Sequence, residues 1–110
     1  MSTHLGEFEQ DLLLVILRLQ DEAYGVSIAR ELVEAADRHV SRGALYATLD
    51  RLERKGYVRW KLAAGSDARQ GLPRRLYCVT AGGRTALGES RERLRRLWRG
   101  VEHLLKGPTS

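Results

Sequence analysis

The residues with the clearest chemical role in this 110-residue chain are arginines and small residues in one segment, residues 41–56 (SRGALYATLDRLERKG). Ser41 is suited to cap a helix through its hydroxyl group, and Gly56 is suited to end one. On that helix Gly43 and Ala47 would let the backbone approach a ligand closely, while the arginines would bind phosphates or guanine edges. The segment is typical of a DNA recognition helix, whose chemistry is binding and not catalysis.

The expected helix has an apolar inner face and an outer face with polar flanks. Four residues fall on the inner face: Leu45, Thr48, Leu49 and Leu52. The candidate DNA contacts lie on the outer face, on the flanks and at the start of the helix: Ser41, Arg42, Gly43, Tyr46, Ala47 and Arg51. Tyr46 could donate to a phosphate or lie against a sugar or base, and the alternative is a half-buried packing residue. Phosphates would repel Asp50, so we expect it to pair with Arg51 or Arg54 within the helix.

Two helices are expected before this one, and they must position it. Apolar side chains recur at helical spacing over residues 5–20 and again over residues 24–36, and a brief turn at 37–40 precedes Ser41. The first helix is apolar nearly all round, so we expect it to be buried in the core or between subunits. The second and third helices, joined by a tight turn, form a helix-turn-helix.

Two strands are expected after the recognition helix. Residues 57–62 alternate between apolar and polar, and residues 75–79 give a second short strand. The side expected to be buried carries Val58, Trp60 and Leu62. A helix-turn-helix followed by a hairpin with a long basic loop, residues 63–74, is a winged helix.

Three arginines of this hairpin are candidate contacts to the DNA backbone or minor groove: Arg69, Arg74 and Arg75. For Arg69, solubility of the loop is an equally good explanation. Cys78 alternates with buried positions and has no second cysteine to react with, which favours an inert packed thiol over a redox sensor.

The last segment predicts a helix that needs a partner. Thr80 is suited to cap it, and apolar residues then recur every seven positions. The expected dimer interface consists of Leu87, Leu94, Leu97, Trp98, Val101 and Leu104. Gly88 and Gly100 weaken the helix locally, so packing against the first helix and a symmetry mate should stabilise it. A two-fold homodimer would present two recognition helices to a pseudo-palindromic site, and the alternative is a helix folded back onto its own domain.

Composition and charge agree with a small DNA-binding protein. The chain has a net charge of +5, a pI of about 9.9 and 43% hydrophobic residues. Residues 1–37 carry 2 basic and 8 acidic side chains, whereas residues 38–75 carry 10 basic and 3 acidic ones. This positive field suits a polyanion, although a solvated basic face would look the same. The fold class is mainly α with a small β-hairpin: residues 1–79 form a winged helix-turn-helix DNA-binding domain, and residues 80–110 form a C-terminal dimerisation helix.

Several other classes of protein are disfavoured. One cysteine and three separated histidines offer neither a disulfide nor a zinc cluster, and no nucleotide-binding glycine loop follows a strand, so we expect no cofactor, no metal and no enzyme. No membrane-spanning run or signal peptide is evident, so a cytoplasmic protein is expected. A dimeric protein-interaction module with a structural winged helix remains the main alternative, and RNA binding lacks an exposed aromatic pair.

The chain resembles the PadR family of transcriptional regulators over nearly its whole length. The resemblance rests on the order and spacing of several pieces: Tyr24-Gly25 with Ile28, Gly43-Ala44-Leu45-Tyr46 with Leu49 and Arg51-Leu52-Glu53, Gly56, Pro73-Arg74-Arg75-Leu76-Tyr77, and Thr80 with Gly83. The chain departs from the family pattern in having Ala47 where many members have proline and Leu76 where an aromatic residue is frequent.

The resemblance implies a winged helix with a single C-terminal dimerisation helix, and repression of a promoter that a small molecule relieves. It places Tyr46 on the typical tyrosine of the recognition helix, and Arg74 and Arg75 on basic wing positions. Some relatives bind flat aromatic compounds between tryptophans at the dimer interface, which makes Trp98 the candidate contact for a small aromatic effector. Simple packing of Trp98 beside the apolar seam is the alternative.

Overall fold

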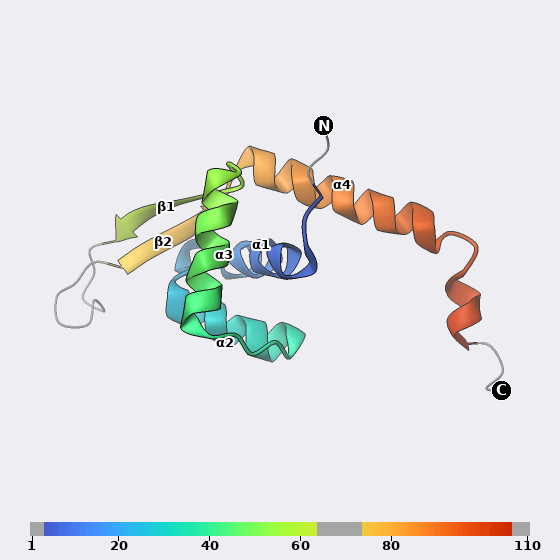
Figure 1. The fold of residues 1–110 in the computed structure, drawn as a ribbon, viewed down its shortest axis with the longest axis horizontal. Coiled ribbons are helices and arrows are strands. Elements are labelled where there is room, and N and C mark those ends of the chain that lie inside the picture. The colour runs from blue at the N-terminus through green and yellow to red at the C-terminus, as the bar shows by residue number, and fades with distance from the viewer. Residues whose placement is uncertain (1–3, 64–73, 107–110) are drawn as a thin grey trace.

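The computed structural model describes residues 4–63 and 74–106, and Arg69 lies outside them. The elements follow the order α1 (Glu7–Leu19), the 3₁₀ turn η1 (Gln20–Glu22), α2 (Gly25–Ala36), α3 (Arg42–Arg54), β1 (Val58–Ala63), β2 (Arg74–Val79), α4 (Ala81–Trp98) and the 3₁₀ turn η3 (Glu102–Lys106). Figure 1 shows α1, α2, α3 and the hairpin gathered together, with α4 leading away from them. The predicted fold class, mainly helical with a two-stranded wing, is confirmed.

Helix α1 runs through the middle of the helical cluster. Its main stripe is fully buried, with Leu12 and Leu13 at 0% exposure and Ile16 at 1%. The remaining side is open, because Leu14 is 49% exposed and Leu17 is 37% exposed. The core of one subunit therefore covers only part of this helix, and burial of the rest between subunits stays a prediction.

The turn between α2 and α3 is fixed by its own backbone and by α1. Helix α2 ends at Ala36, its C-cap Asp37 adopts a left-handed conformation with φ 50°, and Arg38 then reaches back to α1. Its guanidinium binds Asp11 through Nε at 2.8 Å and also contacts Glu7. Ser41 Oγ accepts a hydrogen bond from the Ala44 N–H at 3.1 Å, as predicted for the cap of α3.

The hairpin is antiparallel, with Val58 opposite Val79 and Ala63 opposite Arg74. Only its base reaches the core. Val58 is buried and Trp60 is half-buried, but Leu62 is 59% exposed, so the predicted burial of Leu62 is wrong. The reason is the length of the hairpin, which extends beyond the helices in Figure 1: Leu62 lies near its outer end, opposite Arg75, past the positions of β1 that reach the core.

Cys78 also differs from expectation. It lies opposite Arg59 on the outer side of the hairpin, and it is exposed. The thiol lines a hollow of about 670 Å³ together with side chains that include Leu17 and Arg84. The prediction of a packed thiol is wrong, because Tyr77 and Val79 take the two inward positions of β2 and leave Cys78 between them pointing outward.

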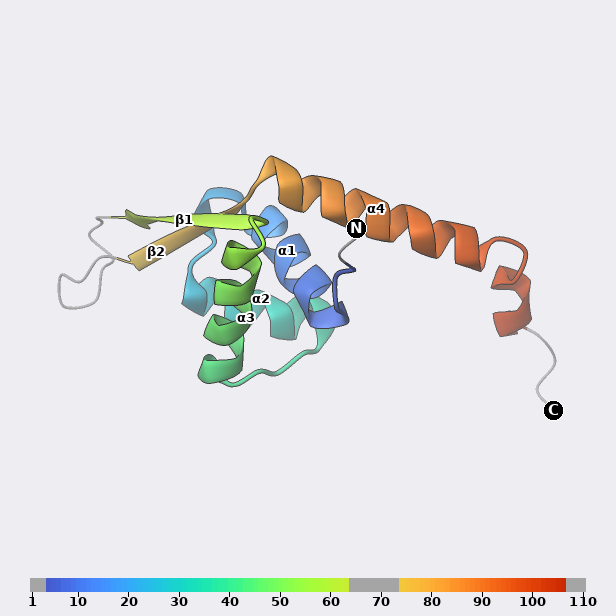
Figure 2. The same ribbon diagram turned by 45° about the horizontal axis from the view of Figure 1, so that its top comes forward.

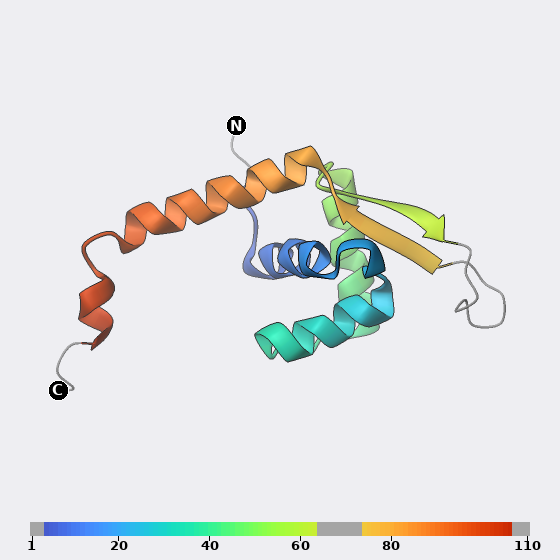
Figure 3. The ribbon, with the colours of Figure 1, turned by 180° about the vertical axis from the view of Figure 1, so that it is seen from behind.

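Helix α4 starts against the winged helix and then leaves it. Thr80 Oγ1 accepts from the Gly83 N–H at 3.0 Å and donates to the Gly56 carbonyl at 2.6 Å. Gly83 is buried, and a Cβ atom there would lie 2.3 Å from the Tyr57 carbonyl oxygen, so this close approach requires glycine. Figures 1 and 3 both show the second half of α4 projecting beyond the other helices.

The predicted continuous C-terminal helix is wrong beyond Trp98. Helix α4 ends there, and Gly100 adopts φ 82°, a left-handed conformation that reverses the chain. A separate 3₁₀ turn, η3, carries Leu104. The seven-residue spacing continues through this break, but Val101 and Leu104 do not share a helical face with Leu94, because glycine has a low helix propensity and tolerates the reversal.

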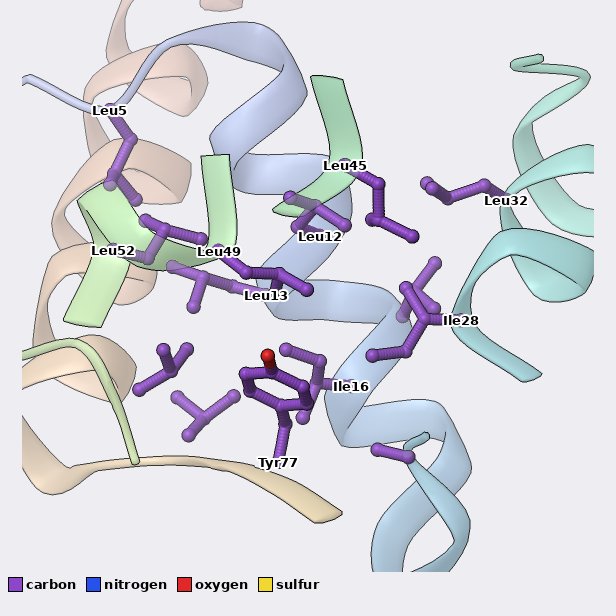
Figure 4. Close-up of a cluster of buried hydrophobic side chains, with 14 of the residues drawn as sticks. Leu5, Leu12, Leu13, Ile16, Ile28, Leu32, Leu45, Leu49, Leu52 and Tyr77 are labelled. Carbon is purple, nitrogen blue, oxygen red and sulfur yellow. The ribbon is translucent and has the colours of Figure 1, made fainter. Parts of the chain in front are cut away.

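The core joins α1, α2, α3 and the base of the hairpin. Figure 4 shows the aromatic ring of Tyr77 pointing from β2 into a cluster of aliphatic side chains that includes Leu13, Ile16 and Ile28. The predicted inner face of α3 is confirmed, since Leu45, Thr48, Leu49 and Leu52 are all buried. This packing holds the opposite face of α3 outward.

Candidate nucleic-acid interface

The outer face of α3 is uncovered in the part of the chain that the structure describes. Figures 1 and 2 show α3 on the near side of the molecule, with the hairpin extending from its C-terminal end. The candidate contacts at its start and on its outer face are exposed: Ser41, Arg42, Gly43 and Ala47. Among the described residues, no heavy atom outside its own helix lies within 4 Å of a Cβ placed on Gly43, so this position offers open space for a ligand's close approach.

Tyr46 lies between α3 and the start of α2. It is half-buried and packs on the edge of the hydrophobic core. Its hydroxyl group occupies the space beside Gly25, where a Cβ atom would lie only 2.0 Å from Tyr46 Oη. The Tyr46 ring is therefore the half-buried packing residue that the sequence offered as the alternative. Contact of its hydroxyl group with DNA stays a prediction. The Arg42 guanidinium lies over this ring, 5.9 Å from its centroid.

Arg51 has a structural partner that the sequence did not reveal. Its Nε donates to Glu9 Oε2 at 3.1 Å, and Lys55 Nζ donates to the same oxygen at 2.8 Å. Glu9 is buried on α1, and its other oxygen accepts from the Gly6 N–H at 2.8 Å. Arg51 thus joins α3 to α1, and its side chain turns toward α1.

The environment of Glu9 keeps it ionised. Burial by itself raises the pKa of this carboxyl, but the hydrogen bonds from Lys55, from the Gly6 N–H and from Arg51 outweigh burial and hold the pKa of Glu9 below its usual value. One signal in the sequence could have revealed it: Glu9 falls on the same side of α1 as the apolar stripe, where an acid needs a cation from another element.

The outer end of the hairpin, next to its loop, holds the two described candidate arginines against aromatic rings. The Arg74 guanidinium lies 4.0 Å from the centroid of Tyr24, and that of Arg75 lies 4.1 Å from the centroid of Trp60. Trp60 Nε1 in turn donates to Glu53 Oε1 of α3 at 3.1 Å. Arg75 is therefore linked to α3 through Trp60, whereas Arg74 packs on Tyr24 at the start of α2.

Asp50 does not pair within its own helix as expected. Its Oδ1 lies 3.9 Å from Arg75 Nη1 on β2. The prediction of a pair with Arg51 or Arg54 is wrong because Arg51 is turned toward Glu9 and Arg75 faces Asp50 from the neighbouring strand.

The expected dimer surface divides into two parts. Leu87 is half-buried and packs against the core of its own subunit, so part of the Leu87 side chain is covered without a partner. The others are exposed: Leu94, Leu97, Trp98, Val101 and Leu104. An apolar groove of about 390 Å³ lies between α1 and α4, with Leu14, Leu17 and Leu94 among its lining residues.

Comparison with known proteins identifies the family. The model described as the transcriptional regulator PadR-like family matches residues 13–89. The chain belongs to this family. It is therefore a transcriptional regulator, which implies DNA binding, and it is not an enzyme. No curated protein matches it.

Solved structures of PadR-like regulators resemble the chain along almost its whole length. A PadR-like regulator from Bacillus cereus has 28% identity and a TM-score of 0.72, and the match covers 92% of this chain and 93% of that one. One from Bacteroides fragilis has 31% identity and a TM-score of 0.69, covering 88% of each chain. One from Clostridium difficile has 26% identity and a TM-score of 0.67, covering 87% of this chain and 97% of that one. Within residues 4–63 and 74–106, no helix has the length and apolarity needed to cross a membrane.

Proposed function

We propose that this PadR-family regulator is a homodimeric repressor that binds a pseudo-palindromic operator. The observation that carries the proposal is the uncovered outer face of α3, with small residues at Gly43 and Ala47, beside arginines held on the wing. This surface has the charge and the close backbone approach that the major groove requires. Action on a promoter would place the protein in the cytoplasm.

The DNA-contacting residues that we propose serve two different purposes. Arg42, at the start of α3, and the wing arginines Arg74 and Arg75 would bind phosphates and set the register of the protein on the duplex. Gly43 and Ala47 would bring the helix close to the base edges. Ser41 caps the start of α3 and would face the groove there. Arg51 contributes positive charge from the flank of α3 while its Nε stays on Glu9.

Dimerisation would use the open side of α1 and the projecting half of α4. Leu14 and Leu17 on α1, with Leu94 and Leu97 on α4, expose an apolar surface that an isolated subunit would leave in water. Figure 3 shows α1 lying between α2 and α4, so a partner helix could reach α1 and α4 together. In this proposal residues 80–110 dimerise with help from the open side of α1, and the rest of residues 1–79 binds DNA.

A small aromatic effector would relieve repression by binding beside this interface. Trp98 supports the proposal because it is 42% exposed at the end of α4, next to the apolar residues assigned to the dimer. An effector there would favour one separation of the two recognition helices over another, and it would weaken operator binding through that difference in affinity.

The experiment that tests the proposal is selection of the purified protein against random duplex DNA, followed by affinity measurements across salt concentrations. We expect an inverted repeat whose affinity falls steeply with salt. The Arg42→Ala variant should weaken binding to the selected site, whereas Arg99→Ala, at the far end of α4, removes the same charge away from α3 and should have a much smaller effect. A folded protein that enriches no sequence would contradict the proposal and favour the protein-interaction alternative.

A further inference from the structure

Asp50 is an acidic side chain on a surface that otherwise suits DNA. It lies on the outer face of α3 with Gly43, Ala47 and Arg54, and its side chain is 50% exposed. A carboxylate that faces phosphates opposes binding, because it adds negative charge where the protein must release counterions. An acidic residue at this position therefore lowers the affinity for every DNA sequence unless it makes a favourable contact of its own.

The structure holds a cation beside Asp50 in a fixed place. Arg75 Nη1 lies 3.9 Å from Asp50 Oδ1, and the Arg75 guanidinium is stacked on Trp60. Trp60 is itself anchored to α3 by the hydrogen bond from its Nε1 to Glu53. The positive charge of Arg75 thus reduces the repulsion between Asp50 and the phosphates without depending on a flexible side chain.

Arg75 leaves the oxygens of Asp50 available. A separation of 3.9 Å is too long for a hydrogen bond, and the carboxylate accepts none from the other described residues. The positive charge of Arg75 therefore balances part of the negative charge of Asp50. The carboxylate is half exposed and can still accept hydrogen bonds through both oxygens. This combination suits recognition of a donor on the ligand.

The donors in the major groove are the amino groups of cytosine and adenine. A carboxylate can only accept, so it is repelled by the acceptor atoms of guanine and thymine, and the N7 acceptor beside the adenine amino group makes adenine less suitable than cytosine. We propose that Asp50 is a specificity-determining residue that accepts a hydrogen bond from the N4 amino group of one cytosine in each half-site. This inference rests on the proposed function, in which α3 enters the major groove.

The proposal also explains why an acid is useful on this surface. Asp50 lowers the affinity for every sequence through its charge, and the hydrogen bond to cytosine restores affinity only at the correct site. The ratio of specific to non-specific binding increases, and this ratio decides how a regulator finds one site among many.

The test is DNA selection with the wild-type protein and with the variants Asp50→Ala and Asp50→Asn. We expect the wild type to enrich cytosine at one position in each half-site, and replacement of that cytosine by thymine to weaken its binding by on the order of tenfold or more. Asp50→Ala should lose this preference, keep the rest of the site, and bind non-specific duplex more tightly. Asp50→Asn should shift the preference to adenine, because an amide both donates and accepts.

The control is Glu34→Gln, which removes one negative charge from an exposed position of α2 and should leave the selected sequence unchanged. Enrichment of the wild-type sequence by both Asp50 variants, with the same preference at every position, would overturn the inference and leave the proposed function standing. Failure of the wild type to enrich any sequence would overturn both. Base substitutions tested with the wild type alone give an independent answer: an enriched site with no cytosine preferred by about tenfold would also overturn it.

Discussion

Single side chains connect the recognition helix to the rest of the protein. The contact between Tyr46 and Gly25 joins α3 to the start of α2 through the close approach of a hydroxyl group to a glycine. On the opposite flank, Arg51 and Lys55 join α3 to α1 through their ion pairs with Glu9. The direction in which α3 presents its outer face therefore depends on contacts on both of its flanks.

Gly25→Ala should destabilise the fold, although alanine normally favours a helix. The new methyl group would lie 2.0 Å from Tyr46 Oη and 2.9 Å from its Cζ, so the ring would have to leave its place, at a cost of about 1–3 kcal/mol. Urea unfolding of Gly25→Ala, Tyr46→Phe and the double variant measures the coupling. Tyr46→Phe should reduce the cost of Gly25→Ala because it removes the atom of closest approach, and strictly additive effects would show that the two residues are not in contact.

Glu9→Gln should lower stability at pH 7 by about 2 kcal/mol, because Arg51 and Lys55 would lose a charged acceptor. The pKa of Glu9 is lower in the folded protein than in the unfolded chain, so its contribution to stability is fully present above the unfolded pKa and is lost as the pH falls through the folded pKa.

Urea unfolding at neutral pH and at successively lower pH checks this prediction. The difference in stability between the wild type and Glu9→Gln should narrow once the pH falls below the unfolded pKa of Glu9, and it should continue to narrow through the lower folded pKa. The exposed Glu34→Gln should show little difference at any of these pH values. An equal gap for Glu9→Gln at every pH would mean that packing, and not charge, is what Glu9 provides.

At the scale of elements, two glycines of α4 have opposite roles. Gly83 lies where a Cβ atom would come within 2.3 Å of the Tyr57 carbonyl oxygen and 2.7 Å of Val79 Cγ1, whereas Gly88 has open space around it. Gly83→Ala should force the start of α4 away from the hairpin and destabilise the protein by about 2 kcal/mol or more. Gly88→Ala should stabilise it by up to about 1 kcal/mol through helix propensity.

Thermal unfolding of these two variants gives a direct comparison, because the chemical change is the same and the two sites lie on one helix. A fall in melting temperature for Gly83→Ala with a rise for Gly88→Ala is the expected result. Similar shifts for both variants would show that helix propensity, and not the docking of α4, decides the effect.

The features predicted correctly from sequence are those that depend on local spacing. The inner face of α3, the cap at Ser41 and the alternation at Val58 follow from the helix and strand periods, and all three are present in the structure. The partners of Arg51 and Asp50 were missed because they come from α1 and β2, and no local pattern specifies which distant element will face a charged residue.

The remaining errors come from the ends of elements. Leu62 keeps the alternation of a buried strand, but the hairpin has already passed the edge of the helices at that point. The spacing of Leu97 and Leu104 continues the apolar pattern, but Gly100 reverses the chain between them. Periodicity shows which side chains share a face only while the helix or strand continues. It predicts burial of that face only where another element lies opposite it.

At the scale of the whole molecule, the described chain exposes its candidate DNA-binding surface and its main apolar surface in different places. The outer face of α3 and the wing carry the candidate DNA contacts, whereas Leu14 and Leu17 on α1 and the second half of α4 carry exposed apolar side chains, with arginines such as Arg95 and Arg96 beside them on α4. This separation allows a subunit to bind DNA with one surface and a second subunit with another. The separation of the two recognition helices in a dimer would then depend on how α4 meets its partner.

If α4 forms the dimer interface, substitutions of two leucines of nearly equal exposure should have different effects. Leu97 on α4 is 62% exposed and Leu62 on the wing is 59% exposed, so Leu→Ser at either position removes a similar apolar side chain from a similar environment in one subunit. Combined with Leu94→Ser, Leu97→Ser should convert the dimer to a monomer in light scattering and weaken operator binding by at least tenfold, because a single recognition helix contacts only one half-site. Leu62→Ser should leave the mass unchanged. A dimer that survives the α4 substitutions would place the interface elsewhere, and a monomeric wild type that binds the operator tightly would remove the need for two-fold symmetry.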